Sequence, residues 1–398
     1  MTAPVAPLPL DGIRVVDFTQ VMLGPCCTQM LGDYGAEVIK IEKGGSGDLS
    51  RWSVGEDPDG LRNPVFCSLN RNKRSVTVDV RAPEGRDAVL RLIDTADVVV
   101  NNFRPGVMDR LGFGYDALSQ RNPRLVYAVG TGFGLQGPNV HKGGQDILAQ
   151  AVTGVMQRKA DPALPLSIYP TALADYSAGM HLVQGILLAL MQRAKTGKGQ
   201  QVSVSLYDSM LAMQMQEAAM WMMRGRDLNW AAMPLTGVFE TTDGAIVLVG
   251  AFKQNPLRDI CAALGFDDLS LEQRFATLER QKENRAEIQA RLRARFAENS
   301  TAHWLARLEE QDLLCAEVKT LAAALDDPQT AANAMVIEAP ATAAGPTRLV
   351  GSPITMSAAP VGVRIPPPAL GADTADVFAA LGLDPETLAP RQPADAVA

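Results

Sequence analysis

The first half of the chain alternates short runs rich in β-branched residues with segments of helical pattern. The β-rich runs are apolar along most of their length, which is typical of strands buried on both faces of a parallel sheet. The helical segments between them would form the crossovers that parallel strands need. The sequence therefore predicts an α/β fold on a parallel sheet. The predicted strands are 13–18, 38–42, 75–80, 97–100 and 125–129, and the predicted helices among them are 25–34 and 84–95.

The segment 176–193 is apolar on nearly every side and carries Gly179 and Gly185, which would let neighbouring elements come close. We therefore expect a buried helix here. A strand at 201–205 and a methionine-rich helix at 207–224 follow. We interpret these methionines as core filler rather than as a ligand-binding surface, because Met adapts to irregular gaps.

Beyond Gly225 the pattern changes to a hairpin at 238–249, followed by helices rich in Glu and Arg. A length of 398 residues also exceeds what one hydrophobic core usually covers, so we predict two domains. The predicted parts are the N-terminal portion of a large domain at 1–223, a linker at 224–235, a small α+β domain at 236–325, and a linker with the C-terminal return to the large domain at 326–398. Within that return we expect a proline-rich extended segment, a helix at 374–381 and a disordered tail at 390–398.

The chain has 37 Lys and Arg against 44 Asp and Glu, which gives a formal net charge of −7. This acidic balance argues against nucleic acid or an anionic membrane as a partner. The sequence shows no signal-peptide pattern and no run of about 18 apolar residues, so we expect a soluble cytoplasmic protein. Its five scattered cysteines and three histidines lack the spacing of a metal site, and we predict none.

Arg71-Asn72-Lys73-Arg74 is the densest basic run of the sequence. Such a run is either a solvated turn or part of a phosphate site, where Lys and Arg donate charge-assisted hydrogen bonds to phosphate oxygens. The residues alone leave both interpretations open.

A literal GxGxxG motif occurs at 132–137, directly after a predicted strand. A dinucleotide site needs this motif to open a helix, so that the pyrophosphate meets the helix N-terminus. Here residues 138–144, PNVHKGG, follow, and their composition is that of a loop. The sequence therefore argues against an NAD(P) cofactor, although a glycine-rich backbone can approach a ligand closely.

Asp175 stands at the start of the apolar segment 176–193. Asp is a favoured N-cap residue, and its charge suits the positive end of a helix dipole. A carboxylate at such a place also stays ionised in apolar surroundings and can act as a nucleophile. The two interpretations are compatible. His181 lies about 120° around a helix from Asp175, so it is poorly placed as a base for that residue.

These residues belong to motifs in which the chain resembles the class III CoA-transferases, the family that includes formyl-CoA transferase and carnitine CoA-transferase. The resemblance extends over essentially the whole chain. Its most specific motifs are LDGIRVVDF at 10–18, GDYGAEVIKIE at 32–42, NKRS at 72–75, DRLG at 109–112, ADYSAGMH at 174–181 and KTGKGQ at 195–200.

The resemblance implies a large Rossmann-like domain, a smaller α+β domain and a homodimer of two interlocked rings. It implies that Asp175 is the catalytic residue. It implies acyl-CoA and a small carboxylic acid as substrates, with no tightly bound cofactor. The residues that match CoA contacts of the family are Lys43, Val78, Asn102, Phe103, Arg110 and Lys142, where Lys43 replaces an Arg of the formyl-CoA enzyme.

The implied reaction moves CoA from an acyl-CoA thioester, with succinyl-CoA as one candidate donor, to a free carboxylic acid. It proceeds through an anhydride and a CoA thioester of the catalytic aspartate. Met22 stands where the formyl-CoA enzyme has Gln, and the chain has no poly-Gly run in the predicted small domain. These departures argue against formyl-CoA or oxalate as substrates.

Two other functions stay open. An acyl-CoA racemase of the same superfamily would use the His of a Gly-His-Asp triplet as the base at the α-carbon, whereas this chain has Gly144-Gln145-Asp146. Gln has no titratable group and cannot serve as that base, although the nearby His141 could take its place. A CoA-ester binding protein without activity is the other alternative.

Overall fold

The computed structural model describes residues 7–55, 63–161, 163–342, 345–359 and 361–384. The chain forms two compact units, each with its own hydrophobic core. Unit 1 consists of Met1–Thr153, Tyr169–Met213 and Pro328–Ala398, and unit 2 consists of Gly154–Ile168 and Gln214–Asp327.

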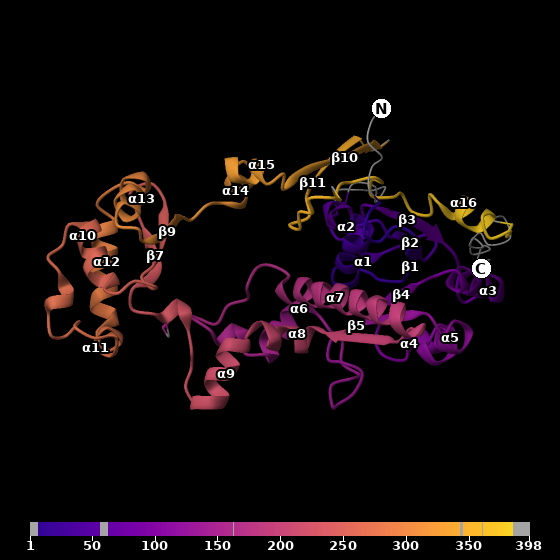
Figure 1. Ribbon diagram of the computed structural model, residues 1–398, viewed down its shortest axis with the longest axis horizontal. Coiled ribbons are helices and arrows are strands. Elements are labelled where there is room, and N and C mark those ends of the chain that lie inside the picture. Colours follow the sequence, from indigo (N-terminus) through magenta and orange to yellow (C-terminus); the bar gives the residue numbers. More distant parts are fainter. Residues whose placement is uncertain (1–6, 56–62, 162, 343–344, 360, 385–398) are drawn as a thin grey trace, which may run out of the picture. The chain divides into compact units, whose positions relative to one another are not determined.

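Unit 1 is built on a six-stranded sheet in which all neighbouring strands are parallel. The strand order β3-β2-β1-β4-β5-β6 reverses direction between β1 and β4, as in a Rossmann-type sheet (Figure 1). The predicted α/β fold with a parallel sheet is therefore confirmed. The strands are β1 Arg14–Asp17, β2 Glu37–Glu42, β3 Lys73–Thr77, β4 Val98–Asn101, β5 Val126–Thr131 and β6 Gln201–Ser205.

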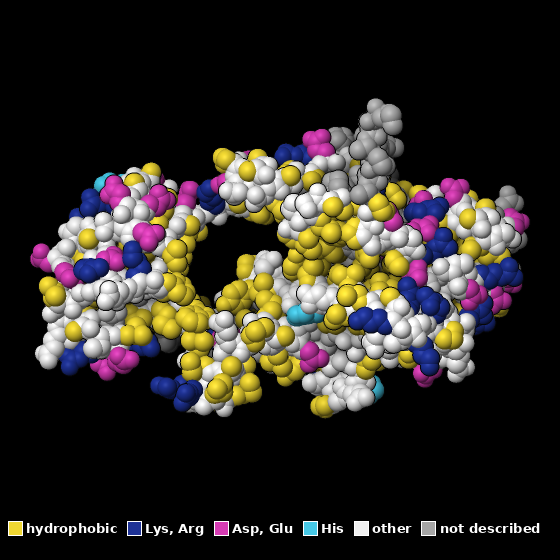
Figure 2. Space-filling view, in the orientation of Figure 1, with side chains coloured by type: hydrophobic (Ala, Val, Ile, Leu, Met, Phe, Trp, Pro, Cys, Tyr) yellow, Lys and Arg dark blue, Asp and Glu magenta, His cyan; other side chains and the backbone are white. Residues whose placement is uncertain are grey.

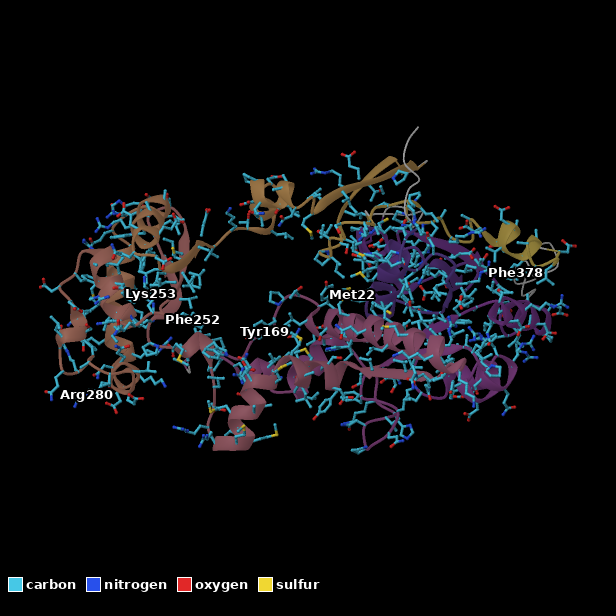
Figure 3. The ribbon with its side chains drawn as sticks, viewed as in Figure 1. Met22, Tyr169, Phe252, Lys253, Arg280 and Phe378 are labelled. Carbon is cyan, nitrogen blue, oxygen red and sulfur yellow. The ribbon has the colours of Figure 1, made fainter. Side chains whose placement is uncertain are left out.

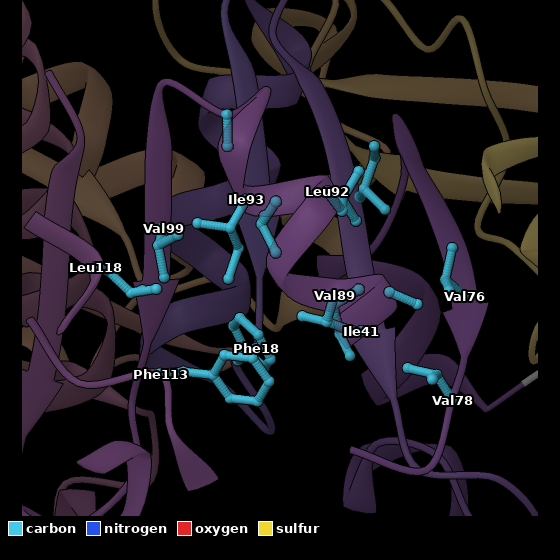
Figure 4. Packing of buried hydrophobic residues seen from close by; sticks show 14 of the residues in the cluster. Phe18, Ile41, Val76, Val78, Val89, Leu92, Ile93, Val99, Phe113 and Leu118 are labelled. Carbon is cyan, nitrogen blue, oxygen red and sulfur yellow. The ribbon is translucent and has the colours of Figure 1, made fainter. Parts of the chain in front are cut away.

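One face of this sheet packs into an apolar core (Figure 4). Because side chains alternate along a strand, Ile39 and Ile41 of β2 point to the same side and join Val99 of β4 in this core. The helices that cover this face are α3 Pro83–Asp94, α4 Val107–Leu111, α5 Tyr115–Arg121 and α16 Thr374–Ala379.

The opposite face of the sheet carries buried charges. The same alternation places Asp17, Lys40 and Lys73 on one side, where all three side chains are fully buried. Helix α1, Leu23–Asp33, covers this side, since Thr28 donates to Asp17 Oδ2 at 2.6 Å and Lys73 donates to the Pro25 carbonyl at 3.1 Å. Polar contacts therefore fix α1 on the sheet.

Helix α7, Leu173–Thr196, packs on α1, β5 and β6. Its contact face is buried and includes Ala178, Gly179 and Leu182, whereas Leu188 and Met191 are exposed. The prediction that this helix is buried on nearly every side is therefore wrong for the face of α7 that carries Leu188 and Met191. Within the described residues, α7 alone is long and apolar enough to cross a membrane, and its packing on the sheet is that of a core helix.

The methionine-rich segment forms two helices, α8 Leu206–Met213 and α9 Met215–Arg224, with a break at Gln214. Met210 of α8 is fully buried. No residue of α9 is buried in the described structure. The interpretation of these methionines as core filler is therefore wrong for α9.

Unit 2 contains an antiparallel three-stranded sheet of β7 Thr236–Glu240, β8 Ala245–Val249 and β9 Leu314–Glu317. The pairing of β7 with β8 confirms the predicted hairpin. Its core includes Phe239, which stacks on Phe296. The longer helices are α10 Pro256–Leu264, α12 Arg285–Phe296 and α13 Thr301–Glu310, and the shorter ones are α11 Leu278–Glu283 and α14 Leu321–Leu325.

The predicted extended return contains elements that the sequence did not indicate. Helix α15, Pro328–Ala332, precedes an antiparallel hairpin of β10 Val336–Thr342 and β11 Gly345–Val350. The predicted tail at 390–398 lies outside the described residues.

After this hairpin the chain runs along the free edge of β3. The Asn72 N–H donates to the Ile365 carbonyl at 2.8 Å, and the Ser75 N–H donates to Asp373 at 2.9 Å. The last described residues therefore cover the edge of the sheet.

The basic run at 71–74 is part of this interior. Arg71 pairs with Asp33 at 2.7 Å, Lys73 pairs with Asp17 at 3.3 Å, and strand β3 begins at Lys73, two residues before the predicted strand start at 75. The run is therefore part of the buried structure, and both interpretations, as a solvated turn and as a phosphate site, are wrong.

The substitution Gly179→Ala tests the close contact of α7 with α1. A Cβ at this position would lie 2.8 Å from the Leu23 carbonyl oxygen, so one of the two helices must shift. Overpacking of this kind costs about 1–3 kcal/mol, and the better helix propensity of Ala offsets about 1 kcal/mol. We expect the free energy of unfolding in urea to fall by about 1 kcal/mol, within a range of about 0–2 kcal/mol.

The matched control is Gly362→Ala, where a Cβ meets nothing within 4 Å. This substitution should change the free energy of unfolding by less than about 0.5 kcal/mol. Equal stability of the two variants would contradict the close packing of α1 and α7.

Candidate active site

The carboxyl ends of β1, β4 and β5 border one cavity of about 420 Å³. Its wall comes mainly from the segments that follow these strands, at 20–23, 102–105 and within 130–145. In open parallel sheets, ligands bind outside the carboxyl ends of the strands where the strand order reverses, which here is between β1 and β4. The cavity therefore lies where this type of sheet binds its ligands.

Asp175 lines this cavity from the first turn of α7, whose N-cap residue is Ala172. The interpretation of Asp175 as the N-cap is therefore wrong. Asp146, at the start of α6 (Asp146–Val152), caps the helix instead. Its Oδ2 accepts hydrogen bonds from the backbone N–H groups of Ala174 at 2.6 Å and Asp175 at 3.0 Å.

Asp146 is buried and is itself held by Gln150, whose Nε2 donates to Oδ1 at 2.6 Å. The sequence analysis treated Asp146 only as a member of the Gly-Gln-Asp triplet. Asp146 and Gln150 are four residues apart, so they lie on the same face of a helix, and this spacing could have predicted their hydrogen bond. Its contact with α7 crosses 28 residues and had no local signal.

Burial raises the pKa of Asp175 to about 6, and the nearby Asp146 acts in the same direction. At pH 7 the carboxylate of Asp175 is therefore still mostly ionised. Among the residues that the structure describes, none donates a hydrogen bond to this carboxylate. A poorly solvated carboxylate is a strong nucleophile, so Asp175 is suited to attack a carbonyl carbon.

The glycine-rich loop after β5 forms another part of the cavity wall. As predicted, its GxGxxG motif does not open a helix, because the next helix begins only at Asp146. A Cβ on Gly132 would lie 2.4 Å from Gly144 Cα, and one on Gly144 would lie 2.3 Å from Gly132 Cα. Glycine at both positions therefore lets the two ends of the loop meet beside the cavity.

Lys142 and Arg104 bring positive charge to the cavity wall. Both side chains are exposed, and neither has an acidic partner in the described part of the chain. Arg104 also lies against the glycine-rich loop, because a Cβ on Gly143 would lie 2.6 Å from its Nη2. Arg104 was not among the predicted site residues, although it directly follows Asn102 and Phe103 in the sequence.

Four of the residues selected by resemblance, Asp175, Asn102, Phe103 and Lys142, line the cavity together. Asn102 uses both ends of its side-chain amide to hold the backbone of Gln20. Its Oδ1 accepts from the Gln20 N–H at 2.9 Å, and its Nδ2 donates to the Gln20 carbonyl at 2.8 Å.

The remaining three selected residues are not among those that line this cavity. Lys43 and Arg110 are exposed on unit 1, and Val78 belongs to the apolar core with a side chain that is 2% exposed. Of the two residues considered for proton transfer, Gln145 lines the cavity and His141 does not.

A Rossmann-type sheet with a free carboxylate and unpaired cations in its ligand cavity is suited to an enzyme that binds an anionic ligand beside a nucleophile. The sequence model of CoA-transferase family III matches residues 10–374. The chain belongs to this family and is a class III CoA-transferase that acts on acyl-CoA.

Relatives match nearly the whole chain. An acyl-CoA transferase of Fusarium pseudograminearum is 37% identical over 394 residues, which are 96% of this chain and 86% of that protein. Succinyl-CoA:glutarate CoA-transferase of Mus musculus is 32% identical over 93% of this chain and 86% of that protein. The crystal structure of a CAIB/BAIF family protein from Brucella suis is 32% identical, with a TM-score of 0.84 over 94% of this chain and 100% of that one.

The substitution Asp146→Asn removes the negative charge beside Asp175 and keeps an oxygen that accepts from the backbone of α7. Because a like charge raises the pKa of a carboxyl group, we expect the pKa of Asp175 to fall below its value of about 6. If Asp175 is the nucleophile, its ionised form reacts, so the acidic limb of the pH profile of kcat/KM should move to lower pH. Initial rates across the acidic range measure this shift.

Asp94→Asn is the control, because Asp94 pairs with Arg121 at the surface of unit 1 and does not line the cavity. Its profile should match that of the wild-type enzyme. An unchanged acidic limb in Asp146→Asn would show that Asp146 does not act on Asp175.

Proposed function

We propose that the enzyme transfers CoA from an acyl-CoA thioester to a free carboxylic acid through covalent intermediates on Asp175. The observation that carries this proposal is the state of the Asp175 carboxylate. It lines the ligand cavity, has a pKa raised to about 6 by burial, and receives no hydrogen bond from the described residues. These properties favour nucleophilic attack over a structural role.

The reaction begins when the Asp175 carboxylate attacks the carbonyl carbon of the thioester. The C–S bond breaks, CoA leaves as a thiolate, and a mixed anhydride of Asp175 forms. The thiolate then attacks the aspartyl carbonyl, which gives an aspartyl-CoA thioester and releases the donor acid. The acceptor carboxylate attacks the carbonyl of this thioester, the C–S bond breaks, and CoA thiolate leaves as a second mixed anhydride forms. The thiolate then attacks the acceptor's carbonyl carbon in this anhydride, which gives the new acyl-CoA and frees the Asp175 carboxylate.

Both intermediates hydrolyse if water reaches them. We infer that the glycine-rich loop at 130–144 covers them, and that its backbone N–H groups donate to the oxyanions that form at each step. Its contribution to the cavity wall supports this role.

Lys142 and Arg104 are proposed to hold the phosphates of CoA, because unpaired cations at a cavity mouth form charge-assisted hydrogen bonds with phosphate oxygens. Phe103 would contact apolar parts of the coenzyme from the same wall. Lys43, Val78 and Arg110 stay proposed contacts on the strength of the resemblance alone.

We propose succinyl-CoA as a donor. The cavity wall offers the amide side chains of Gln20 and Gln145, whose N–H groups can donate to the second carboxylate of a dicarboxylic acid. Among the relatives, the enzymes of Mus musculus and Homo sapiens are succinyl-CoA:glutarate CoA-transferases.

The racemase alternative is not favoured. It needs a base at the position of Gln145, which lines the cavity but has no titratable group. His141 is not among the residues that line it.

We also infer that two copies of the chain assemble as an interlocked homodimer. Helix α9 supports this, because Met215, Trp221, Met222 and Met223 are all exposed and give it an apolar surface (Figure 2). A surface of this kind usually meets a protein partner. Five free cysteines fit a cytoplasmic location, where thiols stay reduced.

Mass spectrometry of a trapped intermediate tests the reaction. Wild-type enzyme incubated with succinyl-CoA and no acceptor, then denatured in acid, should carry CoA on the peptide that contains Asp175. Asp175→Ala should carry none and should lose CoA transfer by at least about a thousandfold, because the nucleophile is absent.

The control is Asp208→Asn, since Asp208 lies outside the cavity wall and pairs with Ser205. It should form the adduct normally. Wild-type transfer rates in Asp175→Ala would reject the covalent scheme. Deuterium entering the α-carbon of an acyl-CoA in the absence of an acceptor acid would instead support a racemase.

The substitution Lys142→Ala tests the phosphate contact. Loss of one charge-assisted hydrogen bond costs about 1.5 kcal/mol, so KM for acyl-CoA should rise about tenfold while kcat changes less. Added salt should shrink the difference, because it screens the exposed charge. Lys195→Ala, at the far end of α7, is the matched control. An equal rise of KM for acyl-CoA in both variants would contradict the assignment of Lys142 to the phosphates.

A further inference from the structure

The turn at Thr19–Met22, between β1 and α1, has a backbone conformation that its sequence does not favour. Val21 lies in the left-handed region with a φ of 66°. A β-branched residue rarely adopts this conformation, and it persists only where the surrounding structure holds it. Gln20, Val21 and Met22 all line the cavity that contains Asp175, and Figure 3 marks Met22 at the start of α1.

Side chains from other segments hold this turn. Lys40 Nζ donates to the Thr19 carbonyl at 2.6 Å, and Asp48 Oδ1 accepts from the Val21 N–H at 3.0 Å. Asn102 binds both backbone groups of Gln20, as described above. Among the described residues, no backbone hydrogen bond closes the turn itself. Its shape therefore depends on these three side chains and on Asp17, whose Oδ1 accepts from the Thr19 N–H at 2.8 Å.

Two of the three form a buried ion pair. Lys40 Nζ lies 2.8 Å from Asp48 Oδ2, and both side chains are fully buried. Burial acts to raise the pKa of Asp48, but Lys40 and the N–H groups of Ser50 and Val21 lower it to about 2. Asp48 is therefore an anion, and the pair stays charged. Neither residue lines the cavity.

We propose that Asp48 and Lys40 are positioning residues for CoA transfer: their ion pair holds Gln20, Val21 and Met22 in the cavity wall where the reacting groups need them. Both residues act through the turn and do not touch the substrate. The proposal rests on the proposed location of the reaction at Asp175.

Stability alone does not account for this pair. A buried ion pair is a weak source of stability, because removing two charges from water offsets most of their attraction. Apolar side chains of similar volume often replace such a pair without loss of stability. What they could not do is bind the Thr19 carbonyl and the Val21 N–H at fixed positions.

The test compares Asp48→Asn, Lys40→Met and the double variant. Lys40 also interacts with Asp17 and Glu42. Each single substitution therefore leaves the buried charges of this cluster unbalanced by one, and Tm should fall. The double variant removes both charges, and Tm should recover most of that loss. The Thr19 carbonyl stays unbound in the double variant, so the turn is not restored.

We therefore expect kcat of the double variant to stay about 10- to 100-fold below the wild-type value, because small displacements of reacting groups cost this much. KM for succinyl-CoA should stay within about threefold, since the phosphate contacts are intact. Recovery of kcat together with Tm would overturn the proposal. If neither single variant folds, the double variant still gives the result.

Asp33→Asn is the matched control. Asp33 and Arg71 form another buried ion pair, which binds the Val350 carbonyl and lies away from the turn. This variant should lose Tm and keep the kcat of the wild-type enzyme at a temperature where it is folded. The rate of CoA transfer is measured in all variants, whatever the intermediates are. Wild-type activity in Asp175→Ala would reject the covalent scheme. It would not decide the role of Asp48, which depends on kcat of the double variant.

Discussion

Three carboxylates and three cations lie buried together on one face of the central sheet, and much of unit 1 depends on their pairing. Taking such ions out of water costs several kcal/mol each, so every member needs its neighbours. Asp17 lies opposite Lys40 in the pairing of β1 with β2, and a slip of one residue would turn these charges toward the apolar core. The cluster thus specifies the strand register. Its members are Asp17, Lys40, Glu42, Asp48, Arg51 and Lys73.

The apolar runs of the first half were readable as strands because a doubly covered sheet needs apolar residues on both faces. The same rule misplaced the start of β3, since Lys73 is a charged residue that Asp17 allows to be buried. The hairpin of β10 and β11 escaped prediction because prolines such as Pro340 argue against strands. Both strands of a two-stranded hairpin are edge strands, and Pro is tolerated in an edge strand. These features depend on partners that no local pattern shows.

The candidate site was predictable to the extent that its residues lie in recognisable motifs. Asp175 stood out because its motif marks the family, and the GxGxxG segment could be assigned to a loop from the residues after it. The residue that caps α7 could not be found this way, because Asp146 lies 28 residues before the Ala174 N–H that it binds and only the fold brings the two together. Val78 shows the opposite case, in which a residue selected by resemblance has its side chain in the core. The sequence predicted the chemistry, and the structure showed which groups surround the predicted nucleophile.

The edge of β3 is covered by residues from the other end of the chain, and Arg51 donates to the carbonyl of Pro368. A ribosome makes the strands of this sheet long before it makes residues 365–374. During that interval the nascent sheet has an open edge, which is a template for pairing with other chains. Completion of unit 1 therefore waits until residues 365–374 have been made. A chain that is cut short before this segment carries all of the cavity wall and lacks the cover that keeps its sheet from joining another.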